Sequence, residues 1–382
     1  MTVRTLDGHI LTPAGFVRGA LAIGEIGRIT AITGDAVASD AVRDSALPIL
    51  LPGFIDCHVH GGAGHDIMEG GRAAAHIARL HAEHGTTSLL ATTMTAPHGD
   101  LEKAFSGLAA VLATAQSGQG RPFGARILGV HLEGPYINPG KLGAQPDFAR
   151  ALLTTELREL SNMASIRLIT LAPEMPGNLD VIRALCDAGY RVQLGHSLAT
   201  YEEGVAALER GAAGFTHLFN AMSAFHHREP GLAGAALAHA TYAEIIPDLL
   251  HVHPGAVRVA LKSIPRLFCV TDSTSATGMP DGEYRLGRHT VTKCMGGVRL
   301  ADGTLAGSTL TLDQALRNLV SEFGLDLAEA SARVSTFAAD YLGETERGRL
   351  APGAWADIVC LDRDLTIQNV FVEGVSRDDA NA

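Results

Sequence analysis

The chain has 382 residues, of which 46% are hydrophobic and 19% charged, and its formal net charge at pH 7 is −11. This composition is typical of a compact globular protein, and the length allows one large domain beside a smaller one. The acidic excess argues against a general nucleic-acid binder, which needs clustered lysines and arginines, and against adhesion to anionic membranes.

The cysteines and the N-terminal segment bear on the cellular compartment. The five cysteines lie singly, without a CxxC pair, which favours reduced thiols. The opening MTVRTLDGHILTP lacks the charged and apolar regions of a signal peptide, and no run of about 18 apolar residues predicts a membrane span. We therefore expect a cytoplasmic protein.

Both ends of the chain alternate short apolar stretches with Gly, Asp and Pro turns, a pattern that predicts small antiparallel strands. It covers residues 1–48 and recurs in 350–382, where ADIVCLD is followed by LTIQNVFVEG. We predict that the two ends meet in a small β-sandwich domain that flanks a main domain over 49–349.

The middle of the chain alternates strand-like and helix-like segments. Helix-like segments such as GRAAAHIARLHAEHG and NLDVIRALCDAG have apolar residues near a 3.6 period. Eight such alternations over roughly 230 residues fit an α/β fold of the (β/α)8 TIM-like barrel class, for which about 250 residues is typical. A doubly wound open sheet is the alternative, but it would not gather side chains from so many strand ends around one centre. The predicted strands are 49–58, 86–93, 126–133, 166–172, 190–196, 212–217, 244–251 and 267–272.

Metal-ligating residue types stand at the ends of several predicted strands. Alternate strand residues share a face, so His58 and His60 can grip one ion together. The carboxyl ends of parallel barrel strands meet at one rim, which would bring the remaining residues to the same place. The sequence therefore predicts a metal-dependent hydrolase whose site is built from His58, His60, Glu133, His196, His217 and Asp272.

Each of these residues also has a structural reading. Glu133 closes a buried apolar run, where a carboxylate must be paired, protonated or bound to a cation, so a salt bridge or a helix cap is its alternative. His131 lies two residues earlier on the same face, and we expect it to support the ligands. Asp272, in VTDS, is the natural general base. Imidazole and carboxylate ligands suit Zn, Fe(II), Mn or Co.

Several motifs occur together in one order over roughly residues 50–362. PGFIDCHVHG, HLEGPYINP, THLFNAM, HHREPG and GRLAPGAWADIVCLD resemble the N-acetylglucosamine-6-phosphate deacetylase family of the amidohydrolase superfamily. The resemblance implies a (β/α)8 barrel with a flanking β-sandwich, a homodimer, and hydrolysis of an N-acetyl group from a hexosamine 6-phosphate.

The resemblance also implies roles for single residues. Glu133, His196 and His217 match the family's metal ligands and Asp272 its catalytic acid/base. Members that keep the His58/His60 pair can hold a second ion, with zinc as the first expectation. The implied substrate contacts are Arg228 to the sugar phosphate, the backbone of Asn220 and Ala221 to the sugar, His251 to the neighbouring subunit's site, and the pocket loop Ala306, Gly307 and Ser308.

Two departures from the family pattern fall on substrate contacts. Gln145 stands where a substrate-contacting His is expected, and it cannot carry positive charge. Leu249 replaces a flexible Gly in the segment Asp248-Leu249-Leu250-His251. Amide hydrolysis is therefore predicted more firmly than the sugar, and N-acetylgalactosamine 6-phosphate stays open as the substrate.

Two other functional classes are alternatives. Another amidohydrolase could act on a cyclic amide or an N-acyl amino acid, but many of these use a carboxylated lysine at a strand end. None of the lysines here clearly ends a predicted strand. A non-catalytic relative should have lost a ligand or the base, and this chain keeps all of them.

Overall fold

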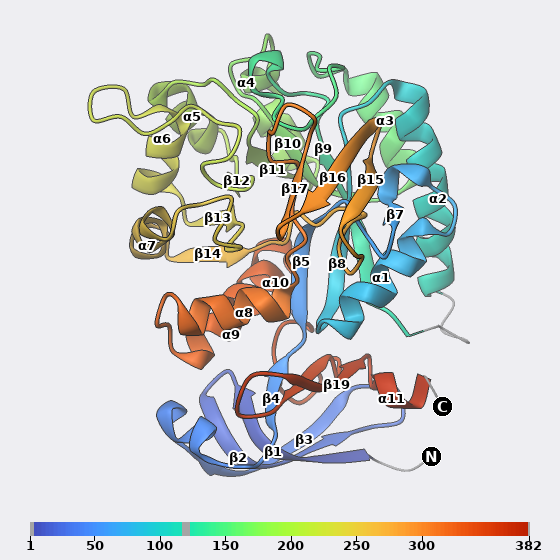
Figure 1. Ribbon diagram of the computed structural model, residues 1–382, viewed down its shortest axis with the longest axis vertical. Coiled ribbons are helices and arrows are strands. Elements are labelled where there is room, and N and C mark those ends of the chain that lie inside the picture. Colours follow the sequence, from blue (N-terminus) through green and yellow to red (C-terminus); the bar gives the residue numbers. More distant parts are fainter. Residues whose placement is uncertain (1–3, 117–122, 381–382) are drawn as a thin grey trace.

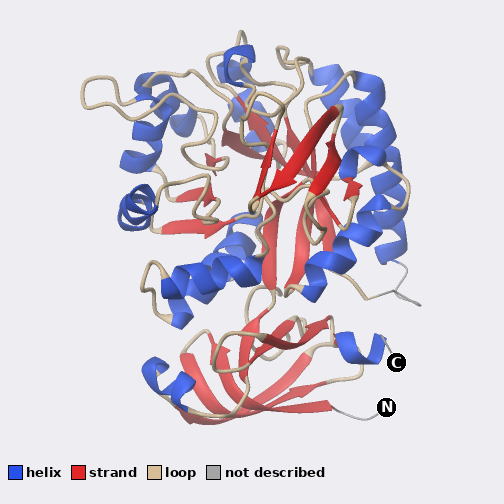
Figure 2. Ribbon diagram, viewed as in Figure 1, coloured by secondary structure: helices blue, strands red, loops and turns tan. Residues whose placement is uncertain are grey.

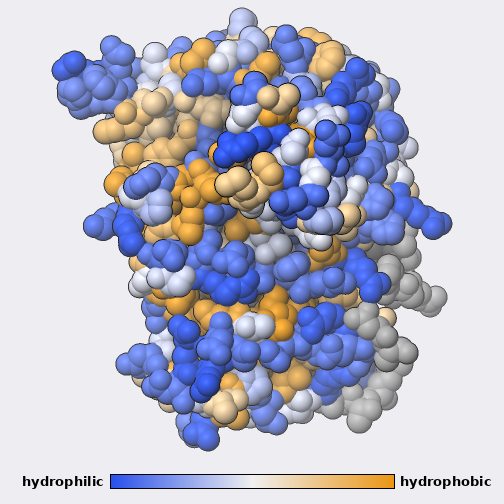
Figure 3. Space-filling view, in the orientation of Figure 1, coloured by the Kyte–Doolittle hydropathy of each residue, from blue (hydrophilic) through white to orange (hydrophobic). Residues whose placement is uncertain are grey.

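The computed structural model describes residues 4–116 and 123–380. A sheet that contains both ends of the chain lies below a larger body, in which helices surround parallel strands (Figures 1 and 2). On the face shown in Figure 3, polar residues cover most of the surface. No helix among the described residues is both long and apolar enough to cross a bilayer.

The lower sheet combines strands from near the two ends of the chain. Its seven strands form one continuous hydrogen-bonded sheet, in which only β1 and β4 pair in parallel. Its own apolar cluster includes Ile10, Leu21 and Phe371. In sheet order the strands are β20 (Val375–Ser376), β19 (Ile367–Val372), β18 (Ile358–Leu361), β4 (Ile49–Pro52), β1 (Arg4–Thr12), β2 (Gly15–Ile23) and β3 (Ile29–Ala36).

The larger body contains a parallel sheet that is curved rather than flat (Figure 2). Two further parallel strands, β13 (Tyr242–Ile245) and β14 (Arg266–Cys269), form a separate pair. Hydrogen bonds from the segments that follow β12 and β14 help to connect this pair to the sheet: the Leu218 N–H donates to the Glu244 carbonyl (2.8 Å), and the Asp272 N–H donates to the His58 carbonyl (3.0 Å). The predicted parallel α/β architecture is thus confirmed in its coarse form. The six strands of the sheet are, in order, β12 (Gly214–Phe215), β11 (Arg191–Leu194), β10 (Ile166–Leu171), β9 (Arg126–Glu133), β8 (Thr86–Thr93) and β5 (Phe54–Val59).

Helices pack outside these strands. A three-stranded antiparallel sheet of β15 (Gly282–Leu286), β16 (His289–Cys294) and β17 (Gly297–Arg299) follows β14. The short pair β6 (Gly61–Gly62) and β7 (His65–Asp66) follows β5. The helices are α1 (Ala73–Glu83), α2 (His98–Gln116), α3 (Thr154–Met163), α4 (Asn178–Asp187), α5 (Tyr201–Glu209), α6 (Gly231–His239), α7 (Pro254–Ser263), α8 (Leu312–Ser321), α9 (Leu327–Val334), α10 (Thr336–Leu342) and α11 (Arg377–Ala380).

The predicted strands 190–196, 212–217 and 267–272 run past the observed ends of β11, β12 and β14, and two further predicted strands also differ from the structure. The strand expected over 244–251 is wrong in its second half, because β13 ends at Ile245 and Asp248 then closes a turn by accepting bonds from the N–H groups of Leu250 and His251. The strand expected over 49–58 is divided at Gly53, with β4 in the lower sheet and β5 in the parallel sheet. Gly53 donates to the Asp357 carbonyl and accepts from the Ser335 hydroxyl (2.6 Å).

A side chain at Gly53 should destabilise the protein, because its Cβ would lie 2.2 Å from Oγ1 and 2.8 Å from Cβ of the buried Thr87. Rotating the Thr87 side chain would not relieve the contact with its Cβ. We expect Gly53→Ala to lower the free energy of unfolding by about 1–3 kcal/mol, as overpacking usually does. Denaturant unfolding measures this. Gly99→Ala is the control, since its Cβ would meet nothing within 4 Å, and equal stability of the two variants would contradict the expectation.

Candidate metal centre

The six metal-type residues lie at or just beyond the carboxyl ends of four parallel strands of the sheet and of β14. His58 is the penultimate residue of β5, Glu133 is the last residue of β9, and His60 directly follows β5. His196, His217 and Asp272 come two to three residues after their strands, with φ angles of 49°, 30° and 50°. Such left-handed backbone is unusual for residues other than glycine and concentrates at functional sites. Here it marks the points where the chain leaves a strand.

Glu133 stands at the centre of the site. Its Oε1 lies 3.0 Å from His196 Nε2 and 2.9 Å from His217 Nε2. Its Oε2 lies 3.0 Å from His60 Nε2 and 3.4 Å from His58 Nε2. All of these residues are buried. One carboxylate therefore faces two histidine pairs, one with each oxygen.

Asp272 lies on the side of the His58/His60 pair. Its Oδ1 is 3.4 Å from His60 Nε2 and 3.5 Å from His58 Nε2. Burial raises the pKa of Asp272, but the nearby charges of His58 and His60 outweigh burial and lower this pKa to about 2. Burial lowers the pKa of His60, and hydrogen bonds to Asp272 and Glu133 raise it to about 9. Protons on the histidines thus balance buried carboxylates, and a bound cation could replace those protons.

The donor set fits a divalent cation. His196 Nδ1 faces the Lys141 carbonyl oxygen at 2.9 Å, which can only accept a hydrogen bond, so Nδ1 carries the hydrogen and Nε2 offers a lone pair. His196 Nε2 and His217 Nε2 are 3.0 Å apart, and both face the Glu133 carboxylate. Ring nitrogens and a carboxylate that converge at such short range are typical of a metal site. Among the described residues, two groups of three ligand atoms share Glu133: His58, His60 and Glu133, and Glu133, His196 and His217.

A cavity of about 230 Å³ opens over this centre. Of the predicted substrate contacts, Gln145, Asn220, Ala221, His251 and Gly307 line the cavity of their own chain. The neighbours of Gly307 are buried: Ala306 is in an apolar cluster, and Ser308 donates through Oγ to the Thr271 carbonyl. Arg228 is exposed and outside the lining, and its Nη1 lies 2.7 Å from His227 Nε2.

Gln145 has a contact that the sequence did not indicate. Its Nε2 donates to Glu133 Oε2 at 2.6 Å, and its Oε1 accepts from the Thr95 N–H at 2.6 Å. Both ends of the amide are therefore engaged, and the side chain holds the central carboxylate while it lines the cavity.

Sequence reasoning missed Glu244. This residue of β13 is fully buried, and its Oε2 lies 3.1 Å from His58 Nδ1. The available signal was a glutamate inside the apolar run YAEII. His131, which we expected to support the ligands, has Nδ1 3.1 Å from the Cys57 carbonyl and Nε2 2.7 Å from Thr170 Oγ1, so both its nitrogens face protein groups.

Known proteins resemble this chain over most of its length. A model of the amidohydrolase family matches residues 49–376. The N-acetylgalactosamine-6-phosphate deacetylase of Escherichia coli O157:H7 is 40% identical, with 87% of this chain and 89% of the relative covered. The N-acetylglucosamine-6-phosphate deacetylase of Vibrio furnissii is also 40% identical, with 85% and 82% covered.

Solved structures agree with these sequences. A mutant N-acetyl-D-glucosamine-6-phosphate deacetylase from Mycobacterium smegmatis, in complex with N-acetyl-D-glucosamine-6-phosphate, superposes with a TM-score of 0.89 at 34% identity and covers 98% of this chain and 99% of its own. The N-acetylglucosamine-6-phosphate deacetylase from Thermotoga maritima superposes with a TM-score of 0.88 at 32% identity, with 98% and 99% covered.

Metal binding should depend more on Glu133 than on His58. The Glu133 oxygens face both histidine pairs, whereas His58 faces only Oε2. We expect Glu133→Gln to lose most bound metal and His58→Ala to keep about one ion where the wild type holds two, as measured by elemental analysis. Glu156→Gln, at a buried glutamate paired with Arg150, is the control. The expectation would be contradicted if the His58→Ala protein contained no metal while the Glu133→Gln protein kept its full metal content.

Proposed function

The chain belongs to the N-acetylglucosamine-6-phosphate deacetylase family of amidohydrolases, and from this premise we propose that it hydrolyses N-acetylglucosamine 6-phosphate to glucosamine 6-phosphate and acetate. The observation that carries the proposal is the Glu133 carboxylate between two histidine pairs, with Asp272 beside one pair, under a cavity open to a small molecule.

The proposed metal ligands are Glu133, His196 and His217 for one divalent ion, and His58, His60 and Glu133 for a second. Zinc suits these imidazole and carboxylate groups best, and Fe, Mn or Co are the alternatives. When bound, such an ion polarises a carbonyl and brings the pKa of a water molecule down towards ~7.

Asp272 is the proposed acid/base. Its low pKa keeps the carboxylate deprotonated at neutral pH, where it can accept the proton of the attacking water. It would then return this proton to the amine nitrogen that leaves the acetyl group. Gln145, through its bond to Glu133 Oε2, would keep the central carboxylate in place during the reaction.

The proposed substrate contacts lie around the cavity mouth. Asn220, Ala221 and His251 would face the sugar, and the loop Ala306, Gly307 and Ser308 would border the pocket. The Arg228 guanidinium would reach the phosphate, for which its fork of donors is well matched. Arg228 is exposed and lies outside the cavity lining of its own chain.

The galactosamine epimer is a second candidate substrate. One relative that is 40% identical is an N-acetylgalactosamine-6-phosphate deacetylase, and Gln145 replaces an expected histidine beside the cavity. Acetate release from both 6-phosphates and from both unphosphorylated sugars tests the proposal. Release from none of the four would contradict the proposed function.

The remaining features of the proposal concern assembly and location. We propose that the eight parallel strands from β5 to β14 form the (β/α)8 barrel of a domain over 49–349, beside a β-domain of 1–48 and 350–382. We also propose a cytoplasmic homodimer, in which His251 would serve the cavity of its own chain, which it lines, rather than the neighbouring one. The exposed Leu249, Leu250 and Met295 would favour the dimer. The five cysteines are free thiols, which agrees with the proposed cytoplasmic location.

Asp272→Asn should lower kcat by at least ~10², the usual scale for a positioned acid/base, while metal content stays normal. Steady-state kinetics and elemental analysis on the same preparation measure both quantities. Asp281→Asn, at an exposed aspartate, is the control. Turnover near the wild-type rate in a fully metallated Asp272→Asn protein would remove Asp272 from the mechanism.

Arg228→Ala should raise KM for the phosphorylated sugar roughly 10- to 100-fold and leave the unphosphorylated sugar nearly unaffected, because a charge-assisted bond contributes about 1.5–3 kcal/mol. The ratio of kcat/KM for the two sugars is the measurement. Arg158→Ala, at an exposed arginine of α3, should leave the ratio unchanged. Equal losses on both sugars would assign Arg228 a structural role.

A further inference from the structure

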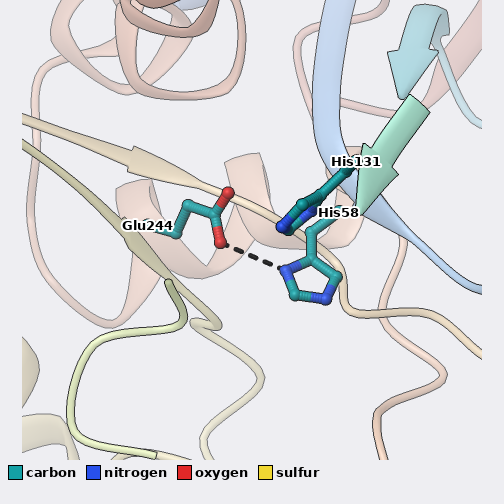
Figure 4. A group of neighbouring side chains, drawn as sticks. All are labelled: His58, His131 and Glu244. Atoms are coloured by element: carbon teal, nitrogen blue, oxygen red, sulfur yellow. Dashed lines mark hydrogen bonds and ion pairs between the residues drawn. The ribbon is translucent and has the colours of Figure 1, made fainter. Parts of the chain in front are cut away.

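Glu244 lies directly behind His58, on the side away from the cavity. Figure 4 shows the hydrogen bond between the Glu244 carboxylate and His58. It also shows His131 beside the His58 ring. Both Glu244 and His58 are fully buried, whereas the cavity is lined by His60, Glu133, His196, His217 and Asp272 and not by Glu244. Glu244 therefore touches the proposed metal centre only through its ligands.

The contact fixes the protonation pattern of the His58 ring. Nδ1 lies 3.1 Å from Glu244 Oε2, so a neutral ring carries its hydrogen on Nδ1 and donates it to the carboxylate. The lone pair is then left on Nε2, which points towards His60 (3.2 Å) and Glu133 (3.4 Å). Histidine ligands in metal sites usually donate their second nitrogen to such a partner, which sets the tautomer and the ring orientation.

The same carboxylate reaches the other histidine pair through the backbone. Glu244 Oε2 accepts from the His217 N–H at 3.2 Å, and the Glu244 carbonyl accepts from the Leu218 N–H at 2.8 Å. His217 has a φ of 30°, so these two bonds hold the chain where it makes its unusual turn out of β12. Glu244 thus contacts a side chain on one half of the centre and only backbone on the other.

His131 does not offer a competing role for the cluster. The ligand atoms of His58, His131 and Glu244 lie close enough to suggest an ion site of their own. Both His131 nitrogens are engaged by the Cys57 carbonyl and Thr170 Oγ1. His131 instead packs edge-on against His58, with ring centroids 4.6 Å apart. The His58 ring is thus held by a hydrogen bond on one side and by packing on another.

We propose that Glu244 is a positioning residue that sets the tautomer and orientation of His58, and so determines the affinity of the ion held by His58 and His60. This inference rests on the proposed metal centre. It assigns Glu244 an effect on one of the two ions, because its bond to His217 reaches only the backbone N–H and does not involve the His217 ring.

The test is metal affinity, measured by competition with a chromophoric chelator for Zn²⁺ on full-length protein. Glu244→Ala should weaken the ion at His58 and His60 by about 10- to 100-fold, the usual effect of removing such a partner, and leave the other ion bound. Glu244→Gln keeps the shape and one acceptor, so it should weaken the same ion by less. On a His58→Ala background, neither change should have a further effect.

Asp313→Asn is the matched control, because Asp313 is a buried carboxylate that faces Nδ1 of His84, and neither residue lines the cavity. It should leave both affinities unchanged. Thermal unfolding of the apoproteins separates positioning from folding, and Glu244→Gln decides the question if Glu244→Ala does not fold. Unchanged affinities, or an equal loss of both ions, would overturn the inference. A wild-type protein that binds no Zn²⁺ would instead contradict the proposed function itself.

Discussion

The buried Glu133 carboxylate is the constraint on which the rest of the site depends. A charge without compensation at this depth would cost several kcal/mol. Four imidazole rings from β5 and from the ends of β11 and β12 surround Glu133, with two rings facing each of its oxygens. Each ring is placed by the strand that carries it, so the arrangement requires the parallel strands to end at one rim.

Further groups hold this arrangement from outside. The Lys141 carbonyl orients His196, Glu244 orients His58, and Gln145 binds Glu133 itself. Lys141 and Gln145 come from the segment between β9 and α3, and Glu244 comes from β13. Polar groups that converge on one cation repel one another when it is absent, so they need fixed supports, and a metal centre commonly depends on such supports as much as on its ligands.

The contact of Gln145 changes the meaning of its departure from the family pattern. The sequence presented Gln145 as a substituted substrate contact, whereas both ends of its amide are bonded within the protein. Its oxygen accepts from the Thr95 backbone, which leaves the amide NH₂ to face Glu133. A change at this position would therefore act on the central carboxylate as well as on the cavity wall.

The sequence by itself indicated the parallel α/β architecture, the shared sheet of the two chain ends and the six metal-type residues that the structure brings together. It could do so because strand periodicity and strand-end positions are local properties of the chain. Tertiary structure alone decided the division at Gly53, the end of β13 at Ile245 and the contact between Glu244 and His58, which are 186 residues apart. The contact of Glu244 with His58 depends on which strands become neighbours. The division at Gly53 depends on the space beside Thr87, which admits only a glycine. The spacing of residues along one strand predicts neither of these features.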